Sequence, residues 1–134
     1  MIPNYLSNLP EFFAFFATGL LLLGVFWALY TLATPHSELQ LIGMGNVSAA
    51  VMLAGAMLGF ALPVAVAMAK SEDVMQLAQW GGVALIVQFG AYLCLRLLNR
   101  GLHEAIEQDR LSVALWAATL SLCAGIINAG AQLA

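Results

Sequence analysis

The chain has 134 residues, of which 63% are hydrophobic and only 8% are charged, and its formal net charge at pH 7 is −3. Soluble domains carry about 25% charged residues, so this composition excludes an ordinary soluble domain, and the length excludes two domains. The 4 basic residues are too few to neutralise a run of phosphates, which excludes a nucleic-acid-binding surface.

Four apolar segments, each long enough to cross a bilayer, occupy most of the chain. About 20 apolar residues in helical form span the ~30 Å hydrocarbon core of a membrane. We therefore predict an all-α, polytopic membrane protein whose residues 1–134 form a single four-helix transmembrane domain in contact with membrane lipid. The predicted spans are residues 12–32, 47–68, 80–98 and 111–133.

The connection after the first span, residues 33–46, gathers polar side chains beside a proline. Pro35 disfavours helical backbone in the residue before it, and Ser37 suits the cap of a short helix on the membrane surface. His36 and Glu38 are candidate functional residues, as a metal-binding, proton-sensing or partner-docking element. The alternative is that they serve capping and hydrogen bonding at a helix break.

Small residues spaced along two of the spans predict where the helices pack. Small side chains allow the backbones of membrane helices to approach closely. Pro63 lies inside the second span, where a proline removes a backbone hydrogen bond, so we predict a kink there. The predicted helix-packing residues are Gly55, Gly59, Ala117, Ser121, Gly125 and Ala129. With only four spans available, contacts within one chain are favoured over contacts between chains.

Amide side chains occur at membrane depth in the third and fourth spans. Gln88 lies near the middle of the third span and Asn128 in the outer half of the fourth. Polar residues at this depth often mark a functional site, so Gln88 is a candidate pore-lining or ligand-contacting residue. The alternative is a hydrogen bond between helices, worth about 1 kcal/mol.

The polar stretches around the third span are short. Residues 69–79 are predicted to form a loop before it, and residues 99–110 a continuing or interfacial helix after it. In that helix Arg96, Arg100 and Glu104 are spaced four apart, which places them on one face. This face is a candidate docking surface.

Basic residues predict the orientation in the membrane. The connections 33–46 and 99–110 share a side with Arg96, Arg100 and Arg110, whereas the other side has only Lys70. By the positive-inside rule, both connections are predicted to face the cytoplasm and both termini the outside.

The two halves resemble each other at a shift of 64 residues, where Ser48-Ala49-Ala50 falls on Ser112-Val113-Ala114. Residues 12–68 and 80–133 would then be two copies of a two-helix hairpin, inserted in the same direction as parallel repeats. The alternative is that any four-helix membrane protein looks periodic.

Several segments are similar to a known family. The stretch from Thr34 to Ile42, the stretch from Leu58 to Pro63 and the stretch from Trp80 to Gln88 resemble the YjfL family of small bacterial inner-membrane proteins. The likeness covers nearly the whole chain and its Thr-Pro-His element is fairly specific. The resemblance implies a four-span inner-membrane protein with two repeats of a two-span unit, and a link to envelope stress, but no established activity.

These features favour a non-enzymatic membrane subunit. We expect a homo-oligomer, or a complex with a cytoplasmic or membrane protein partner, and no catalytic, cofactor-binding or metal-binding residues. A small oligomeric channel or transporter is the alternative, motivated by the repeat and the central amide. His36 and Glu38 alone make a poor acid–base constellation. The predicted docking surface consists of Pro35, His36, Glu38, Arg96, Arg100 and Glu104.

Overall fold

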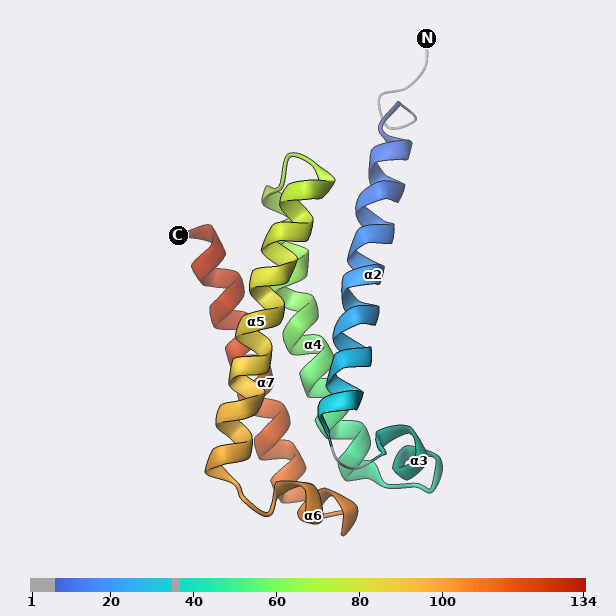
Figure 1. Ribbon diagram of the computed structural model, residues 1–134, viewed down its shortest axis with the longest axis vertical. Coiled ribbons are helices and arrows are strands. Elements are labelled where there is room, and N and C mark those ends of the chain that lie inside the picture. The colour runs from blue at the N-terminus through green and yellow to red at the C-terminus, as the bar shows by residue number, and fades with distance from the viewer. Residues whose placement is uncertain (1–6, 35–36) are drawn as a thin grey trace.

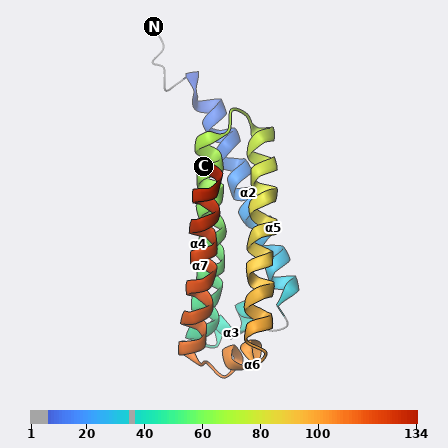
Figure 2. The same ribbon diagram turned by 90° about the vertical axis from the view of Figure 1, so that its left-hand side faces the viewer.

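The computed structural model describes residues 7–34 and 37–134, which form six helices and contain no strand (Figure 1). The long helices are α2 (Leu9–Ala33), α4 (Val47–Lys70), α5 (Val74–Leu98) and α7 (Leu111–Leu133). The short helices α3 (Glu38–Gly43) and α6 (Leu102–Glu107) lie together at one end of the molecule (Figures 1 and 2). All four long helices are long and apolar enough to cross a membrane. The predicted all-α, four-span fold is therefore confirmed.

The connection between α4 and α5 differs from the prediction. Instead of a loop over residues 69–79, only residues 71–73 separate the two helices. The carboxylate of Asp73 accepts a hydrogen bond from the backbone N–H of Gln76 at 2.8 Å and so caps the first turn of α5. Hydropathy marks the membrane boundary, whereas this cap starts the helix in the polar region before that boundary.

Helices α4 and α7 run in the same direction and pack along their length (Figures 1 and 2). A Cβ added at Gly55 would lie 2.5 Å from the Cα of Ala118, and one added at Gly59 would overlap the backbone of Ser121. One added at Gly125 would overlap the carbonyl oxygen of Gly59. Absent side chains at these three glycines therefore bring the two backbones into direct contact.

The other residues of the predicted packing set lie at different depths on α7. Ala117 is fully buried, whereas Ala129 is half-buried. Ala118, which was not in the predicted set, takes the position opposite Gly55. The small residues of α7 thus face α4 through its N-terminal and central turns.

Pro63 is buried and α4 continues through it from Val47 to Lys70. Proline has no N–H, so the carbonyl of Gly59, four residues earlier, loses its usual helical donor. That same carbonyl oxygen is the one that Gly125 approaches. The predicted kink at Pro63 stays a prediction.

Aromatic rings fill the space where α2 meets α4 and α5. Phe26 is 1% exposed and stacks on Phe60 of α4 at 4.7 Å between ring centroids. It also contacts Phe89 of α5 at 5.5 Å and Tyr30 at 5.7 Å. These rings are the main attachment of α2, because only Gly19, Phe26 and Tyr30 of this helix are buried.

The connections that contain α3 and α6 end with the same backbone conformation and the same hydrogen-bond pattern. Gly45 after α3 and Asp109 after α6, 64 residues later, both have a positive φ, of 88° and 56°. The backbone N–H of Asn46 donates to Leu41 and that of Arg110 donates to Ala105, each at 2.9 Å. The two halves therefore share the order long helix, short helix, left-handed residue and long helix.

Candidate functional site

Polar side chains gather at the end of the molecule where α3 and α6 lie. Asn46 precedes α4, and its side-chain oxygen accepts from the N–H of Ala49 at 2.8 Å while its Nδ2 donates to the carbonyl of Ile106 at 2.8 Å. Asp109 follows α6, and its carboxylate accepts from the backbone N–H of Ser48 at 2.9 Å. Both connections therefore satisfy donors at the N-terminus of α4, where the helix dipole favours an anion.

Lowering the pH is expected to weaken this attachment. The nearby hydroxyl of Ser48, and then the hydrogen bond from its backbone N–H, hold the pKa of Asp109 below its ordinary value of 3.8. A carboxylate whose pKa is lower in the folded state than in the unfolded state stabilises the fold at any pH above its unfolded-state pKa. This stabilisation is lost as the pH falls through the lowered pKa of the folded state. We therefore expect the melting temperature measured in detergent to decrease when the pH is lowered below 3.8.

The matched variant is Asp109→Asn, since asparagine tolerates a positive φ but does not titrate. Its melting temperature is expected to depend less on pH in that acid range than the wild-type value does. Equal acid sensitivity in both proteins would show that Asp109 is not responsible.

A line of titratable side chains leads inward from α6. His103 is half-buried, and its Nε2 lies 3.1 Å from the hydroxyl of Tyr92 on α5. The rings of Tyr92 and Tyr30 meet edge to face at 5.4 Å between centroids. Glu38 interacts electrostatically with both phenol groups. The short helices thus place an imidazole and a carboxylate against a pair of tyrosines inside the bundle.

The structure corrects the predicted docking surface at Glu38, which is 2% exposed and faces inward. It begins α3, and within the first turn of this short helix Glu38 is buried while Leu39 and Gln40 are exposed. Pro35 and His36 lie outside the described residues. A role for Glu38 on an exposed surface is therefore wrong.

The predicted helical face of Arg96, Arg100 and Glu104 is also wrong. Helix α5 ends at Leu98 and α6 begins at Leu102, so the three residues belong to two helices and the connection between them. Spacing by four places side chains on one face only while the helix is continuous. All three side chains are nevertheless exposed.

Gln88 lies where α4, α5 and α7 meet. Its side chain is 3% exposed, and its Nε2 donates to the backbone carbonyl of Ser121 at 3.0 Å. A Cβ added at Gly59 would lie 2.6 Å from the same nitrogen, so the amide fits against that glycine. This position matches the hydrogen bond between helices that was the alternative to a pore-lining role.

A second polar group lies at the opposite end, near the C-terminus. Lys70 at the end of α4 donates to the backbone carbonyl of Gln132 at 2.9 Å, and its Nζ lies 3.3 Å from the ring centroid of Trp80. The side chain of Gln132 donates in turn to the carbonyl of Pro63 at 3.2 Å. Gln132 was not among the predicted site residues, although it lies one helical turn after Asn128 on the same face of α7.

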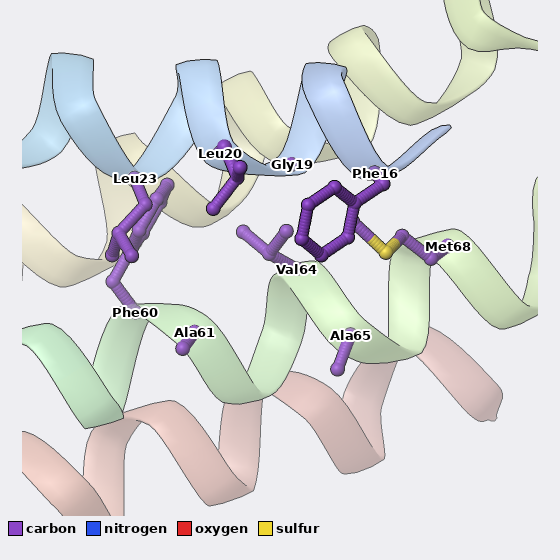
Figure 3. Close-up of a pocket in the computed structure, with 9 residues that line it drawn as sticks. All are labelled: Phe16, Gly19, Leu20, Leu23, Phe60, Ala61, Val64, Ala65 and Met68. Atoms are coloured by element: carbon purple, nitrogen blue, oxygen red, sulfur yellow. The ribbon is translucent and has the colours of Figure 1, made fainter. Parts of the chain in front are cut away.

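An apolar groove of about 240 Å³ lies between the N-terminal half of α2 and the C-terminal half of α4 (Figure 3). Every side chain drawn in it is hydrocarbon except for the methionine sulfur. Small residues on both helices form part of its walls. The lining residues are Phe16, Gly19, Leu20, Leu23, Phe60, Ala61, Val64, Ala65 and Met68.

The described residues contain no cluster of side chains suited to bind a metal ion. No group of three or more His, Cys, Asp or Glu side chains lies together in residues 7–34 and 37–134. Cys94 and Cys123 are both free thiols on exposed faces of their helices.

Comparisons with known proteins agree with a membrane assignment. A family model described as Domain of Unknown Function (DUF350) matches residues 4–132. The chain is 32% identical over 126 residues to the UPF0719 inner membrane protein YjfL of Escherichia coli strain K12, covering 94% of this chain and 96% of that protein. The protein of the same name from Escherichia coli O157:H7 matches equally. No solved structure matches the chain.

The resemblance to the YjfL family that the sequence indicated is confirmed by these matches. Four apolar helices in a chain similar to an inner membrane protein fit a multi-pass protein of the inner membrane. The match over residues 4–132 leaves little of the chain outside the family model, and the chain therefore belongs to the DUF350 family.

Proposed function

We propose that this protein is a non-enzymatic subunit of the inner membrane that acts as a homo-oligomer. The observation that carries the proposal is the groove between α2 and α4, together with the alanines beside it. In the most apolar stretch of α2 only 11% of the residues are buried within the chain, against 50% in α4. Helix α2 thus leaves much of its surface for other contacts.

Small residues favour a protein helix as the partner of this surface. Ala61, Ala65 and Ala69 are spaced four apart on α4, and Ala65 and Ala69 are exposed. Lipid tails are as apolar as leucine, so burial in lipid does not drive helices together, and close backbone contact at small residues supplies the association energy instead. A helix of a second copy would find both a groove and a row of small residues there.

The test is the oligomeric state in native-lipid particles. In Ala65→Leu the larger side chain would occupy part of the groove and keep a partner helix away. This variant is expected to shift the mass of the particles from that of the oligomer toward that of the monomer. Ala78→Leu on α5 is the matched control, because Ala78 is exposed and lies outside the groove, and it is expected to leave the mass unchanged. A wild-type protein that is monomeric, or equal masses for both variants, would contradict the proposal.

We also propose that the end with α3 and α6 faces the cytoplasm and serves a protein partner. Arg96, Arg100 and Arg110 lie at this end and are exposed, whereas Lys70 lies at the other. The excess of basic residues supports this orientation by the positive-inside rule. The buried position of Gln88 favours a subunit of this kind over a channel enclosed by one chain.

The shared construction of the two halves supports an internal repeat. We propose that each half is one copy of a hairpin of two long helices joined through a short one. The left-handed residues at Gly45 and Asp109 and the matching hydrogen bonds around them are the supporting observation. Parallel packing of α4 and α7 fits two copies inserted in the same direction.

A further inference from the structure

Three amide side chains lie buried between the middle of the bundle and the end nearer to the termini. Gln88 reaches in from α5, and Asn128 and Gln132 lie one turn apart on the face of α7 that packs against α4; they are 3%, 7% and 8% exposed. Each keeps one polar atom without a hydrogen-bond partner among the described residues. These atoms are Oε1 of Gln88, Nδ2 of Asn128 and Oε1 of Gln132. A buried polar group left unpaired costs about 1–3 kcal/mol.

The backbone beside these amides carries a further acceptor. The carbonyl of Gly59 lacks its helical donor because Pro63 has no N–H, and Gly59 lies against both Gln88 and Gly125. Gly125 covers this carbonyl from α7. The part of the α4–α7 interface nearer to the C-terminus, which we call the seam, therefore offers Nδ2 of Asn128 as a donor and Oε1 of Gln132 as an acceptor. A ligand that pairs with all of these must both donate and accept hydrogen bonds.

The charges around the seam define the ligand further. The three amides contribute no carboxylate or imidazole, which disfavours a divalent cation. Lys70 stands at the outer end, where its Nζ donates to the carbonyl of Gln132, and its positive charge opposes the entry of any cation. A neutral molecule that donates and accepts is favoured, and buried water typically makes about three such hydrogen bonds.

The opposite half of the same interface is apolar and closed. Ala114 and Ala117 are fully buried, and Gly55 lies in backbone contact with Ala118. Gly59 lies in the same kind of contact with Gly125 and with the backbone of Ser121, between Asn128 and Gln88. Direct contact of two helix backbones leaves no room for water between them, so Gln88 lies on the closed side.

We propose that Asn128 and Gln132 form a water-binding seam that is entered from the Lys70 end and closed at the contact of Gly125 with Gly59. The bound water would satisfy both amides and link α7 to α4 within the membrane. The inference concerns the single chain and holds whether or not the protein forms oligomers.

The test is magnetisation transfer from water to the side-chain amide protons of the wild-type protein in lipid nanodiscs, measured by NMR. Asn128 is the decisive residue, since Gln132 lies close to the membrane surface. We expect cross-peaks between water and the Asn128 side-chain NH2 group. The backbone N–H of Ala117 on the same helix is the control and is expected to show none. No cross-peak at Asn128 would overturn the proposal.

A thermal measurement gives an independent answer. If Asn128 binds water, Asn128→Leu breaks the network and lowers the melting temperature. If the amide is dry and unpaired, the same substitution removes a buried unpaired group and raises the melting temperature, which would overturn the proposal. Ile127→Leu on the exposed neighbouring position is the control and is expected to leave the melting temperature unchanged.

Discussion

Replacing Gly125 by alanine is expected to force α4 and α7 apart. The new methyl group would overlap the carbonyl oxygen of Gly59, and both partners are backbone atoms of packed helices, so no side-chain rotation relieves the contact. Overpacking of a well-packed interior costs about 1–3 kcal/mol, and we expect the upper part of that range. Equilibrium unfolding in mixed detergent micelles measures the free energy of unfolding directly.

The control for this variant is Gly130→Ala on the same helix. A Cβ at Gly130 meets no atom within 4 Å, and alanine is the better helix former. Its free energy of unfolding is expected to stay within about 0.5 kcal/mol of the wild-type value or to rise. If the two variants lose the same stability, the close contact of Gly125 with Gly59 is not what holds the helices.

Replacing Phe26 by alanine is expected to lower the free energy of unfolding by about 3 kcal/mol, as for other truncations of buried aromatic side chains. In a membrane the lost stability does not come from transfer to water, because lipid is as apolar as the protein interior. It comes from the cavity and from the ring contacts with Phe60, Phe89 and Tyr30. Because few residues of α2 are buried, this helix is expected to detach first.

Limited proteolysis and unfolding in micelles would measure both effects. Phe13→Ala is the matched control, because Phe13 lies on the same helix and is 59% exposed. It is expected to leave stability and protease resistance unchanged. A protein that tolerates Phe26→Ala as well as Phe13→Ala would show that the aromatic cluster does not attach α2.

The sequence predicted which residue types occur in the candidate site, but it did not predict where several of them lie in the fold. Glu38 was expected on a surface, yet it lies under the bundle beside Tyr30 and Tyr92. Arg96 and Arg100 were expected on one helix, yet the chain breaks between them. In both cases the polar residues were identified correctly from the local sequence. Their exposure and their helical face depended on where a short connection turns back against the long helices.

The polar contacts between halves were out of reach for a different reason. Hydrogen bonds join residues that are 60 to 62 positions apart in the chain: Asn46 with Ile106, Ser48 with Asp109, and Lys70 with Gln132. No periodicity within one segment records such a pairing. The parallel alignment of α4 with α7 decides it.

By itself the sequence determined the medium of this protein and its four spans, because hydropathy and length are local properties that each segment carries alone. Only the tertiary structure decided which faces are interior. In water an apolar face marks the core, but in lipid both faces of a helix are apolar, so the exposed Ala65 and the buried Ala117 look alike in sequence. Their difference arises only when glycines on α4 meet the small residues of α7 and bring the two backbones together.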